Sequence, residues 1–239
     1  MDRHIPFRAV LFFGCWMLCA FTSPQHATAG SQNVYAVYLQ KYGVLAGYEL
    51  QLKGTFRMHA VLTGKSNLRW FKVFLPHATF RLTTQGQLFL EELQIKSNLR
   101  LQYDNNNRIV KMGKISFAYR QDGRLKRMGN MKISYDISGR MRKLGSFALT
   151  YQRDGSLKSI NTLNITINHI SRLTAIGPHK VLWQTNGRIQ QIGPVTVSYH
   201  PIQGTVVASS VQSGRPPFRF SVFWDNRSVC QTLMGKTRR

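Results

Sequence analysis

A sixteen-residue repeat between Tyr103 and Tyr199 constrains the fold of this chain more than any other feature. Each unit reads Gly-Arg-apolar, two variable residues, apolar-Gly, and then alternating apolar residues that end in an aromatic residue. The first glycine slot recurs in steps of 16 and holds Asn107, Gly123, Gly139, Gly155, Ser171 and Gly187. Because the weaker copies keep the phase of the stronger ones, the pattern predicts tandem units that stack on one another.

Two turn signals occur in every unit. Asp122-Gly123, Asp154-Gly155 and Asn186-Gly187 are typical of two-residue hairpin loops of type I′, in which both central residues have positive φ. The second glycine, as in Gly113-Lys114 and Gly193-Pro194, suits a type II′ turn, whose first central residue favours glycine. Two turns in one unit leave two strands of about four to six residues each.

The spacing of apolar residues differs between the two strands. The second strand alternates, as in Ile115, Phe117 and Tyr119, which indicates one buried and one exposed face. In the first strand Leu125 and Met128 are three apart, which a β-bulge or a second, thinner apolar layer would accommodate. An alternative runs each unit as one strand through the glycine, but it places Gly-Pro pairs inside a strand. We therefore expect an all-β fold of hairpin repeats that form a continuous antiparallel sheet or a solenoid-like array.

The remaining chain divides around the repeats. Arg3, Arg8, the apolar run 9–21 and Ala27-Thr28-Ala29 predict a signal peptide at 1–29, with an uncleaved signal anchor as the alternative. The run is short for a membrane span. Residues 30–102 are expected to form a diverged β region that caps the array, in which 34–45 is either a helix or a strand. The repeats occupy 103–199, and 200–239 are expected to supply closing strands and a basic tail.

Charge is the second strong signal. The chain has 33 lysines and arginines against 9 acidic residues, a net charge of +24. Cleavage before Gly30 would remove Asp2, Arg3 and Arg8 and leave 31 against 8, or +23. Outside the cytoplasm such a chain attracts polyanions through long-range, salt-sensitive forces. Lipopolysaccharide, nucleic acid, acidic glycans and anionic lipid headgroups all qualify. Cations that protect sheet edges are the alternative explanation, and account for only part of the excess.

The repeat aligns basic residues into a predicted strip. Arginine makes bidentate contacts with phosphates and carboxylates, so a strip of this kind suits a polyanion. Alternatively, the same arginines could lie over the tyrosines of the adjacent hairpin as surface cover. The candidate polyanion-binding residues are Arg108, Arg124, Arg140, Arg172, Arg188, Lys126, Arg127, Arg142 and Lys143, and Lys111 joins them.

The aromatic slot forms a second row. Exposed rings at fixed spacing could stack on bases or sugars. Because these residues continue the apolar alternation, packing against the next hairpin with the hydroxyl in solvent is the favoured interpretation. The slot holds Tyr119, Tyr135, Tyr151, Ile167, Trp183 and Tyr199.

Sequence signatures of catalysis or metal binding are not found. The Gly-Lys-Ser at 64–66 and the Gly-Lys-Thr at 235–237 lack the earlier glycine of a phosphate-binding loop. The acidic residues are too scattered for an acid–base pair, and the histidines lack metal-ligand spacing. We therefore expect no enzyme activity, metal or cofactor. After signal cleavage Cys230 is the remaining cysteine, so no intramolecular disulfide is expected.

The segment Tyr135-Asp136-Ile137-Ser138-Gly139-Arg140 resembles the Tyr-Asp repeats of large bacterial surface, secreted and toxin-shell proteins, which form β-hairpin strips. The resemblance implies a bacterial, extracytoplasmic β-repeat and identifies no catalytic or ligand residue. With the charge, it predicts a secreted or periplasmic non-enzymatic module that binds a polyanion of the cell envelope or surroundings. The alternative is a structural or assembly protein that contacts another protein through the repeat edges.

Overall fold

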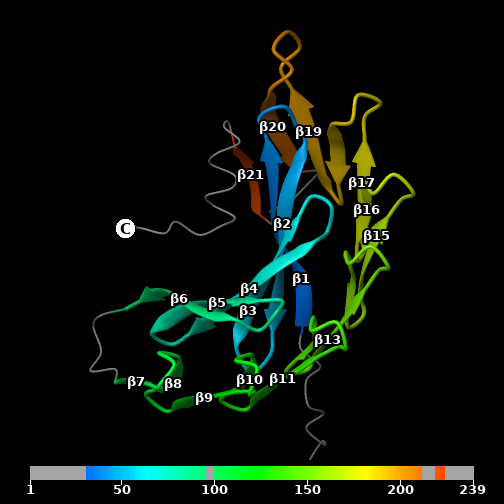
Figure 1. Ribbon diagram of the computed structural model, residues 1–239. Helices are drawn as coiled ribbons and strands as arrows, with labels where there is room; N and C mark the ends of the chain where they lie inside the picture. Colours follow the sequence, from blue (N-terminus) through cyan, green and yellow to red (C-terminus); the bar gives the residue numbers. More distant parts are fainter. Residues whose placement is uncertain (1–30, 95–99, 212–218, 224–239) are drawn as a thin grey trace, which may run out of the picture.

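The computed structural model describes residues 31–94, 100–211 and 219–223, and all regular secondary structure in these ranges is β-strand. The strands form two sheets, so the all-β prediction is confirmed (Figure 1). No helix long and apolar enough to cross a membrane occurs in these ranges. The predicted signal peptide, Cys230 and the basic tail lie outside the described residues.

The N-terminal sheet has the strand order β21-β1-β2-β3-β4-β5-β6. Strands β1 to β6 form an antiparallel meander, and β21 pairs with β1 in parallel. The segment 34–45, which the sequence left open between helix and strand, lies in β1, a turn and the start of β2. The strands are β1 (Ser31–Gln40), β2 (Leu45–Lys53), β3 (Arg57–Thr63), β4 (Leu68–Leu75), β5 (Ala78–Thr83), β6 (Leu88–Leu93) and β21 (Arg219–Phe223).

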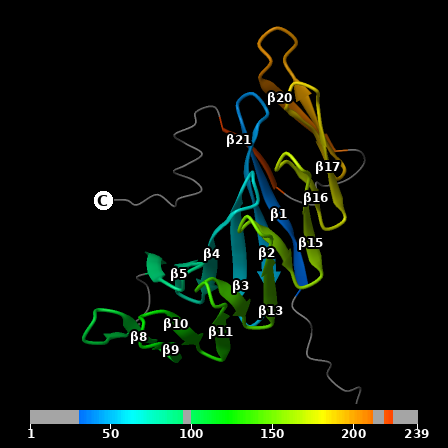
Figure 2. The same cartoon turned by 45° about the vertical axis from the view of Figure 1, so that its right-hand side comes forward.

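The second sheet, here called the array, holds fourteen strands that follow one another in chain order from β7 to β20. It runs alongside the N-terminal sheet in both views (Figures 1 and 2). Its strands are β7 (Leu101–Tyr103), β8 (Ile109–Met112), β9 (Ile115–Tyr119), β10 (Leu125–Met128), β11 (Met131–Tyr135), β12 (Met141–Leu144), β13 (Phe147–Tyr151), β14 (Leu157–Ile160), β15 (Leu163–Ile167), β16 (Leu173–Ile176), β17 (His179–Trp183), β18 (Ile189–Ile192), β19 (Val195–Tyr199) and β20 (Val206–Val211).

One of the two predicted turn types is confirmed and the other is wrong. Gly129 has φ 52° between the paired Met128 and Met131, and positive φ occurs only at this first central residue, as type II′ requires. At the Asp-Gly turn, the Arg120 N–H donates to the Arg124 carbonyl (2.8 Å), which closes a three-residue loop. That loop is a type I turn followed by a left-handed glycine, because only Gly123 has positive φ (83°). An Asp-Gly pair fits both loops, so the sequence pair alone did not distinguish them.

A β-bulge lies in the first strand of the unit. Leu125 pairs with Tyr119 and Arg127 pairs with Ala118, so Lys126 is an extra residue. The bulge turns both Leu125 and Met128 into the core, where each is 0% exposed. The predicted bulge is therefore confirmed, and the alternative of one strand running through the second glycine is wrong. The same register shift recurs in the pairs β11–β12, β13–β14, β15–β16 and β17–β18.

Both sheets bury their inward residues in one apolar core. Phe80 of the N-terminal sheet and Phe117 of the array bring their ring centroids to 5.6 Å from each other. Phe71 and Leu50 are 0% exposed in the same core. A single hairpin cannot bury such an apolar face alone, so each unit depends on its neighbours and on the N-terminal sheet.

Three turns of the N-terminal sheet dock on the array at every second repeat. The N–H groups of Leu125, Leu157 and Ile189 are 32 residues apart. They donate in turn to the carbonyls of Gly86 (2.9 Å), Ser66 (3.0 Å) and Gly43 (3.0 Å). All three acceptors have positive φ, between 60° and 85°. Successive hairpins of the N-terminal sheet therefore dock on the array two units apart.

Gly86 provides a test of this docking. A Cβ at Gly86 would overlap the Tyr135 hydroxyl, whereas a Cβ at Gly123 would meet only the Arg108 Nη1, at 3.7 Å. Both glycines have similar φ, 85° and 83°. We expect Gly123→Ala to cost about 1–2 kcal/mol from the left-handed backbone, and Gly86→Ala to cost about 1–3 kcal/mol more by displacing the ring. Denaturant unfolding measures both, and equal losses would contradict the docking.

Candidate functional site

Five of the predicted arginines directly follow the first glycine slot of the repeat, and we call them the slot arginines. They lie over the aromatic residues of the array. The guanidinium carbon of Arg108 is 4.7 Å from the Tyr119 ring centroid, and that of Arg140 is 4.9 Å from Tyr151. The other distances are 5.6 Å for Arg124 over Tyr135, 5.6 Å for Arg172 over Trp183 and 5.4 Å for Arg188 over Tyr199. These are cation–π distances. The geometry is that of the alternative in which the arginines cover the rings, except that each arginine covers the ring of its own hairpin and not that of the adjacent one.

Turn aspartates hold some of these arginines further. Asp104 Oδ2 accepts from Arg108 Nε (2.7 Å) and pairs with its Nη2 (2.6 Å). Asp136 Oδ2 lies 3.1 Å from Arg140 Nε, and its Oδ1 accepts from the Arg140 N–H (2.9 Å). The Arg108 side-chain hydrogen bond is the main cause that lowers the pKa of Asp104. The Tyr-Asp sequence thus fixes an arginine beside its own turn.

The aromatic row is half-buried and hydrogen-bonded. The Tyr135 hydroxyl donates to the Leu125 carbonyl (2.6 Å), and the Tyr151 hydroxyl donates to the Met141 carbonyl (2.7 Å). Tyr119, Trp183 and Tyr199 make the equivalent bond to the carbonyl ten residues earlier. The rings are packed against the core, as predicted, but each bonds the first strand of its own hairpin rather than the next hairpin, and the hydroxyls do not point freely into solvent. Burial raises the pKa of Tyr119, Tyr135 and Tyr151 to about 12.

The other predicted cations lie on the outer face of the array, which is turned away from the shared core. The bulge makes two successive residues point outward, so Lys126 and Arg127 are both exposed, as are Arg142 and Lys143 in the next unit. Exposed Lys111 and Lys132 belong to the same face. We call this group the outer cation cluster; it comprises Lys111, Lys126, Arg127, Lys132, Arg142 and Lys143.

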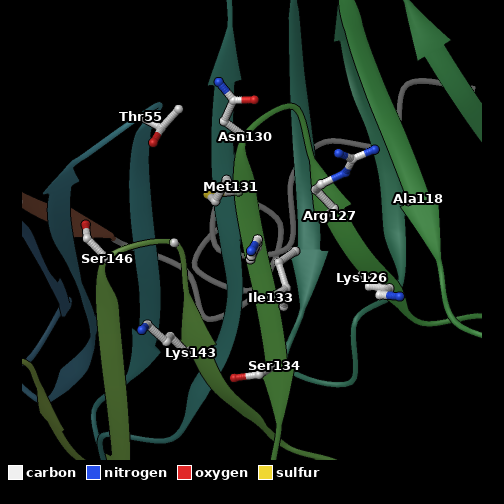
Figure 3. Close-up of a pocket in the computed structure, with 12 residues that line it drawn as sticks. Thr55, Ala118, Lys126, Arg127, Asn130, Met131, Ile133, Ser134, Lys143 and Ser146 are labelled. Carbon is white, nitrogen blue, oxygen red and sulfur yellow. The ribbon is translucent and has the colours of Figure 1, made fainter.

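A hollow of about 780 Å³ lies within the outer cation cluster (Figure 3). Arg127 and Lys143 stand on either side of strand β11 in this view. The loop between β2 and β3 reaches the hollow from the N-terminal sheet with Thr55. Four cations and four neutral polar residues are among its lining: Lys126, Arg127, Lys132 and Lys143, with Thr55, Asn130, Ser134 and Ser146.

The cations of the hollow are close together without acidic partners. Arg127 is directly opposite Lys132 across β10 and β11, a like-charge pair that destabilises a sheet. Lys143 is opposite Ser134 on the other side of β11. Among the described residues, no ion pair involves any of the four cations. The array's described aspartates all lie in the three-residue turns or directly before them. An anion from outside the protein would therefore neutralise positive charge that no described side chain neutralises.

The candidate residues from the sequence did not include Lys132 or Thr55. The Gly129-Asn130 turn contains the signal for Lys132, because a two-residue loop that pairs Met128 with Met131 also pairs Arg127 with Lys132. Thr55 carries no such signal, since its place depends on how the two sheets pack. The nine predicted residues thus fall into ring-covering arginines and outward-facing cations.

A buried polar cluster in the N-terminal sheet was also not predicted. The Tyr38 hydroxyl donates to Glu49 Oε1 (2.8 Å), and His59 Nδ1 lies 3.0 Å from Glu49 Oε2. Burial alone would raise the pKa of Glu49, but the hydrogen bonds from His59 and Tyr38 and the charge of Lys72 outweigh it and lower that pKa. Glu49 and His59 are 7% and 5% exposed, so a substrate does not reach them in this conformation. No group of acidic, His or Cys side chains suited to a metal ion gathers in the described ranges.

A scan against models of known protein families finds no match, and a search of curated proteins finds no similar sequence. The resemblance to Tyr-Asp repeats therefore stays a prediction.

The hydroxyl bonds of the aromatic row are testable by removal of one oxygen. Tyr135→Phe leaves the Leu125 carbonyl without its donor, and we expect a loss of about 1 kcal/mol in unfolding free energy. Tyr103 is the matched control: it fills the same slot at the start of the array, and the residue is 53% exposed. Tyr103→Phe should leave stability unchanged in denaturant unfolding, and equal effects would argue against the hydroxyl bond.

The raised tyrosine pKa values predict alkaline instability. Tyrosine titrates near pH 10 in an unfolded chain, but Tyr119, Tyr135 and Tyr151 titrate near 12 in the folded protein. The unfolded chain therefore loses these protons at a lower pH than the folded protein does. The stability that the three tyrosines contribute is complete below about pH 10 and is lost as the pH rises through 12. Unfolding midpoints across this window should fall less steeply for the triple Tyr→Phe variant than for the unchanged protein. Identical slopes would contradict this assignment.

Proposed function

We propose that this protein is a secreted or periplasmic, non-enzymatic binding module that holds a polyanion of the cell envelope or surroundings on the outer face of its β-repeat array. The observation that carries the proposal is the outer cation cluster, in which exposed cations face one another with no ion-pair partner among the described residues. An anion bound there would relieve the repulsion between Arg127 and Lys132.

The position of the charge supports a binding role more than a general solubility role. Lys111, Arg127 and Lys143 occupy one slot of the repeat. Farther along the array the same slot holds Ser159, Ala175 and Gln191. Cations that only protected a sheet from association would be needed along its whole length. The six cations of the cluster lie on β8–β12, and Lys158 and Lys180 are the exposed cations of the later described strands. This concentration in the first half of the array is the pattern of a local binding surface.

The two groups of predicted residues take different roles in this proposal. The slot arginines stabilise the hairpins by covering the rings, and they contribute to binding mainly through the long-range potential. The outer cation cluster makes the direct contacts with the ligand. An extracytoplasmic location rests on the predicted signal peptide at 1–29.

An assembly role is the second candidate, and β6, which is the last strand of the N-terminal sheet among the described residues, favours it. Phe89 and Leu90 of this edge strand are 43% and 37% exposed, and Tyr103 of β7 is 53% exposed. Together with neighbouring residues they line a hollow of about 450 Å³. A partner protein that adds a strand at this edge would cover these side chains. Such a complex would survive high salt.

A salt series tests the proposed function. We expect the chain from Gly30 onward to bind lipopolysaccharide, duplex DNA and an acidic glycan at low salt, but not a neutral glycan, and to lose binding steeply as salt rises. Neutralising four cluster cations to Gln should flatten the slope of log K against log salt on DNA by about 3–4, since each phosphate contact contributes about 0.9. The four positions are Lys126, Arg127, Arg142 and Lys143.

A charge-matched control separates local binding from net charge. It carries the same four neutralisations at exposed cations outside β8–β13, and we expect it to keep most of the affinity. Equal losses in the two variants would show that no local surface exists. Absence of binding even at low salt would overturn the proposed function and favour the assembly role. The control positions are Lys65, Arg69, Arg153 and Lys180.

A further inference from the structure

We propose that the hollow lined by Arg127, Lys132 and Lys143 is a subsite for an acidic saccharide that carries at least two acid groups. This inference rests on the proposed function and deepens it, because it names the ligand class and the residues that select it.

A second hollow at the repeat-equivalent position of the array can be compared with this subsite. This second hollow, lined by Thr162, Leu163, Asn164, Gly177 and Pro178, lies two repeats farther along. These residues are 32 positions after Asn130, Met131, Lys132, Gly145 and Ser146 of the first hollow. The hairpin geometry is therefore the same, but Asn164 stands where the first hollow has Lys132. The basic character of the first hollow is not a requirement of the repeat.

The two hollows also differ in how the N-terminal sheet meets them. At the second one, Gln32 of β1 donates a hydrogen bond to Thr162 Oγ1 (2.9 Å), and the space that remains is about 290 Å³. At the first one, the approaching residue is the short, exposed Thr55, and the space is about 780 Å³. The first hollow is thus both wider and cationic, and its volume lies in the range of small-ligand sites.

The lining favours a sugar over the other polyanions. Among the described residues, no aromatic side chain lines the hollow, so bases would find no ring on which to stack. The aromatic row is held under the slot arginines. Asn130, Ser134, Ser146 and Thr55 instead offer neutral donors and acceptors of the kind that match sugar hydroxyls. The alkyl stems of the lysines supply apolar contact around them.

The cations are arranged for more than one acid group. Arg127 and Lys132 face each other across one strand pair, and Lys143 lies diagonally from Lys132 on the other side of β11. Diagonal neighbours are about 7–8 Å apart in a sheet. Arg127 can hold one acid group in a bidentate contact, and Lys143 is free to meet a second. A ligand with two acid groups gains both contacts, whereas a neutral sugar gains neither.

The test uses the repeat-equivalent residues as substitutions. The triple variant Arg127→Ser, Lys132→Asn and Lys143→Ala installs the residues found at 159, 164 and 175, which this fold already accommodates. Calorimetry with a sulfated tetrasaccharide prepared from heparin should show at least a tenfold loss of affinity in this variant. A control variant with Lys65→Gln, Arg153→Gln and Lys180→Gln should lose less than threefold, and unfolding curves establish that both variants fold.

Two further probes decide the ligand class. The desulfated tetrasaccharide should bind at least tenfold more weakly than the sulfated one. A thymidine tetranucleotide, which meets these cations only through its phosphates, should bind more weakly than the sulfated sugar and should lose less than threefold in the triple variant. Unchanged sugar binding in the triple variant would overturn the subsite, while salt-sensitive polyanion binding by the unchanged protein would still support the proposed function. Tetranucleotide binding that is as tight as sugar binding and equally dependent on the hollow would overturn the saccharide class.

Discussion

One extra residue in the first strand of each repeat is the constraint on which the rest of the array depends. The bulge at Lys126 lets Leu125 and Met128 both enter the core, although an uninterrupted strand would turn them to opposite faces. It also turns two successive cations outward. The Leu125 N–H meanwhile donates to Gly86 of the N-terminal sheet. Burial, docking and surface charge therefore arise from the same local irregularity.

The docking turns of the N-terminal sheet account for the one unit that lacks both the arginine and the ring. Gly86 and Gly43 lack a Cβ, and the Tyr135 and Tyr199 rings occupy that space. The third docking turn carries Ser66, whose side chain accepts from the Tyr48 hydroxyl (2.7 Å). The unit that docks on Ser66 has Ile167 in its aromatic slot and Ser156 in its arginine slot. A ring at that slot would meet the Ser66 side chain, so the weak copy of the repeat fits its partner.

In the proposed function, stability and binding use different basic residues. An arginine over a half-buried ring keeps its charge, but its guanidinium is oriented by the ring and, at Arg108 and Arg140, by a turn carboxylate. The cations of the hollow have neither constraint, because no ring contact or ion pair engages them within the described ranges. A repeat can therefore keep its architecture while its outward slots change from Arg127 to Ser159. Binding specificity can vary along the array without loss of the fold.

The sequence by itself determined the features that recur within one unit. The sixteen-residue period, the type II′ turn, the bulge and the buried alternation all follow from local backbone preferences and from neighbours close in the chain. The Asp-Gly turn was predicted with the wrong loop length, because the same residue pair suits two turns that differ by one residue. Lys132 could have been paired with Arg127 from the Gly129-Asn130 turn.

Only the tertiary structure decided what depends on contacts between distant segments. The separate N-terminal sheet, the parallel pairing of β21 with β1 and the docking of Gly43, Ser66 and Gly86 join residues far apart in the chain. The same holds for Thr55 in the hollow. Repeat periodicity specifies how a unit meets the next unit, but it contains no information about a sheet outside the repeat. That sheet determines which hollow of the array stays open, whereas the cations around the hollow come from the sequence of the repeats themselves.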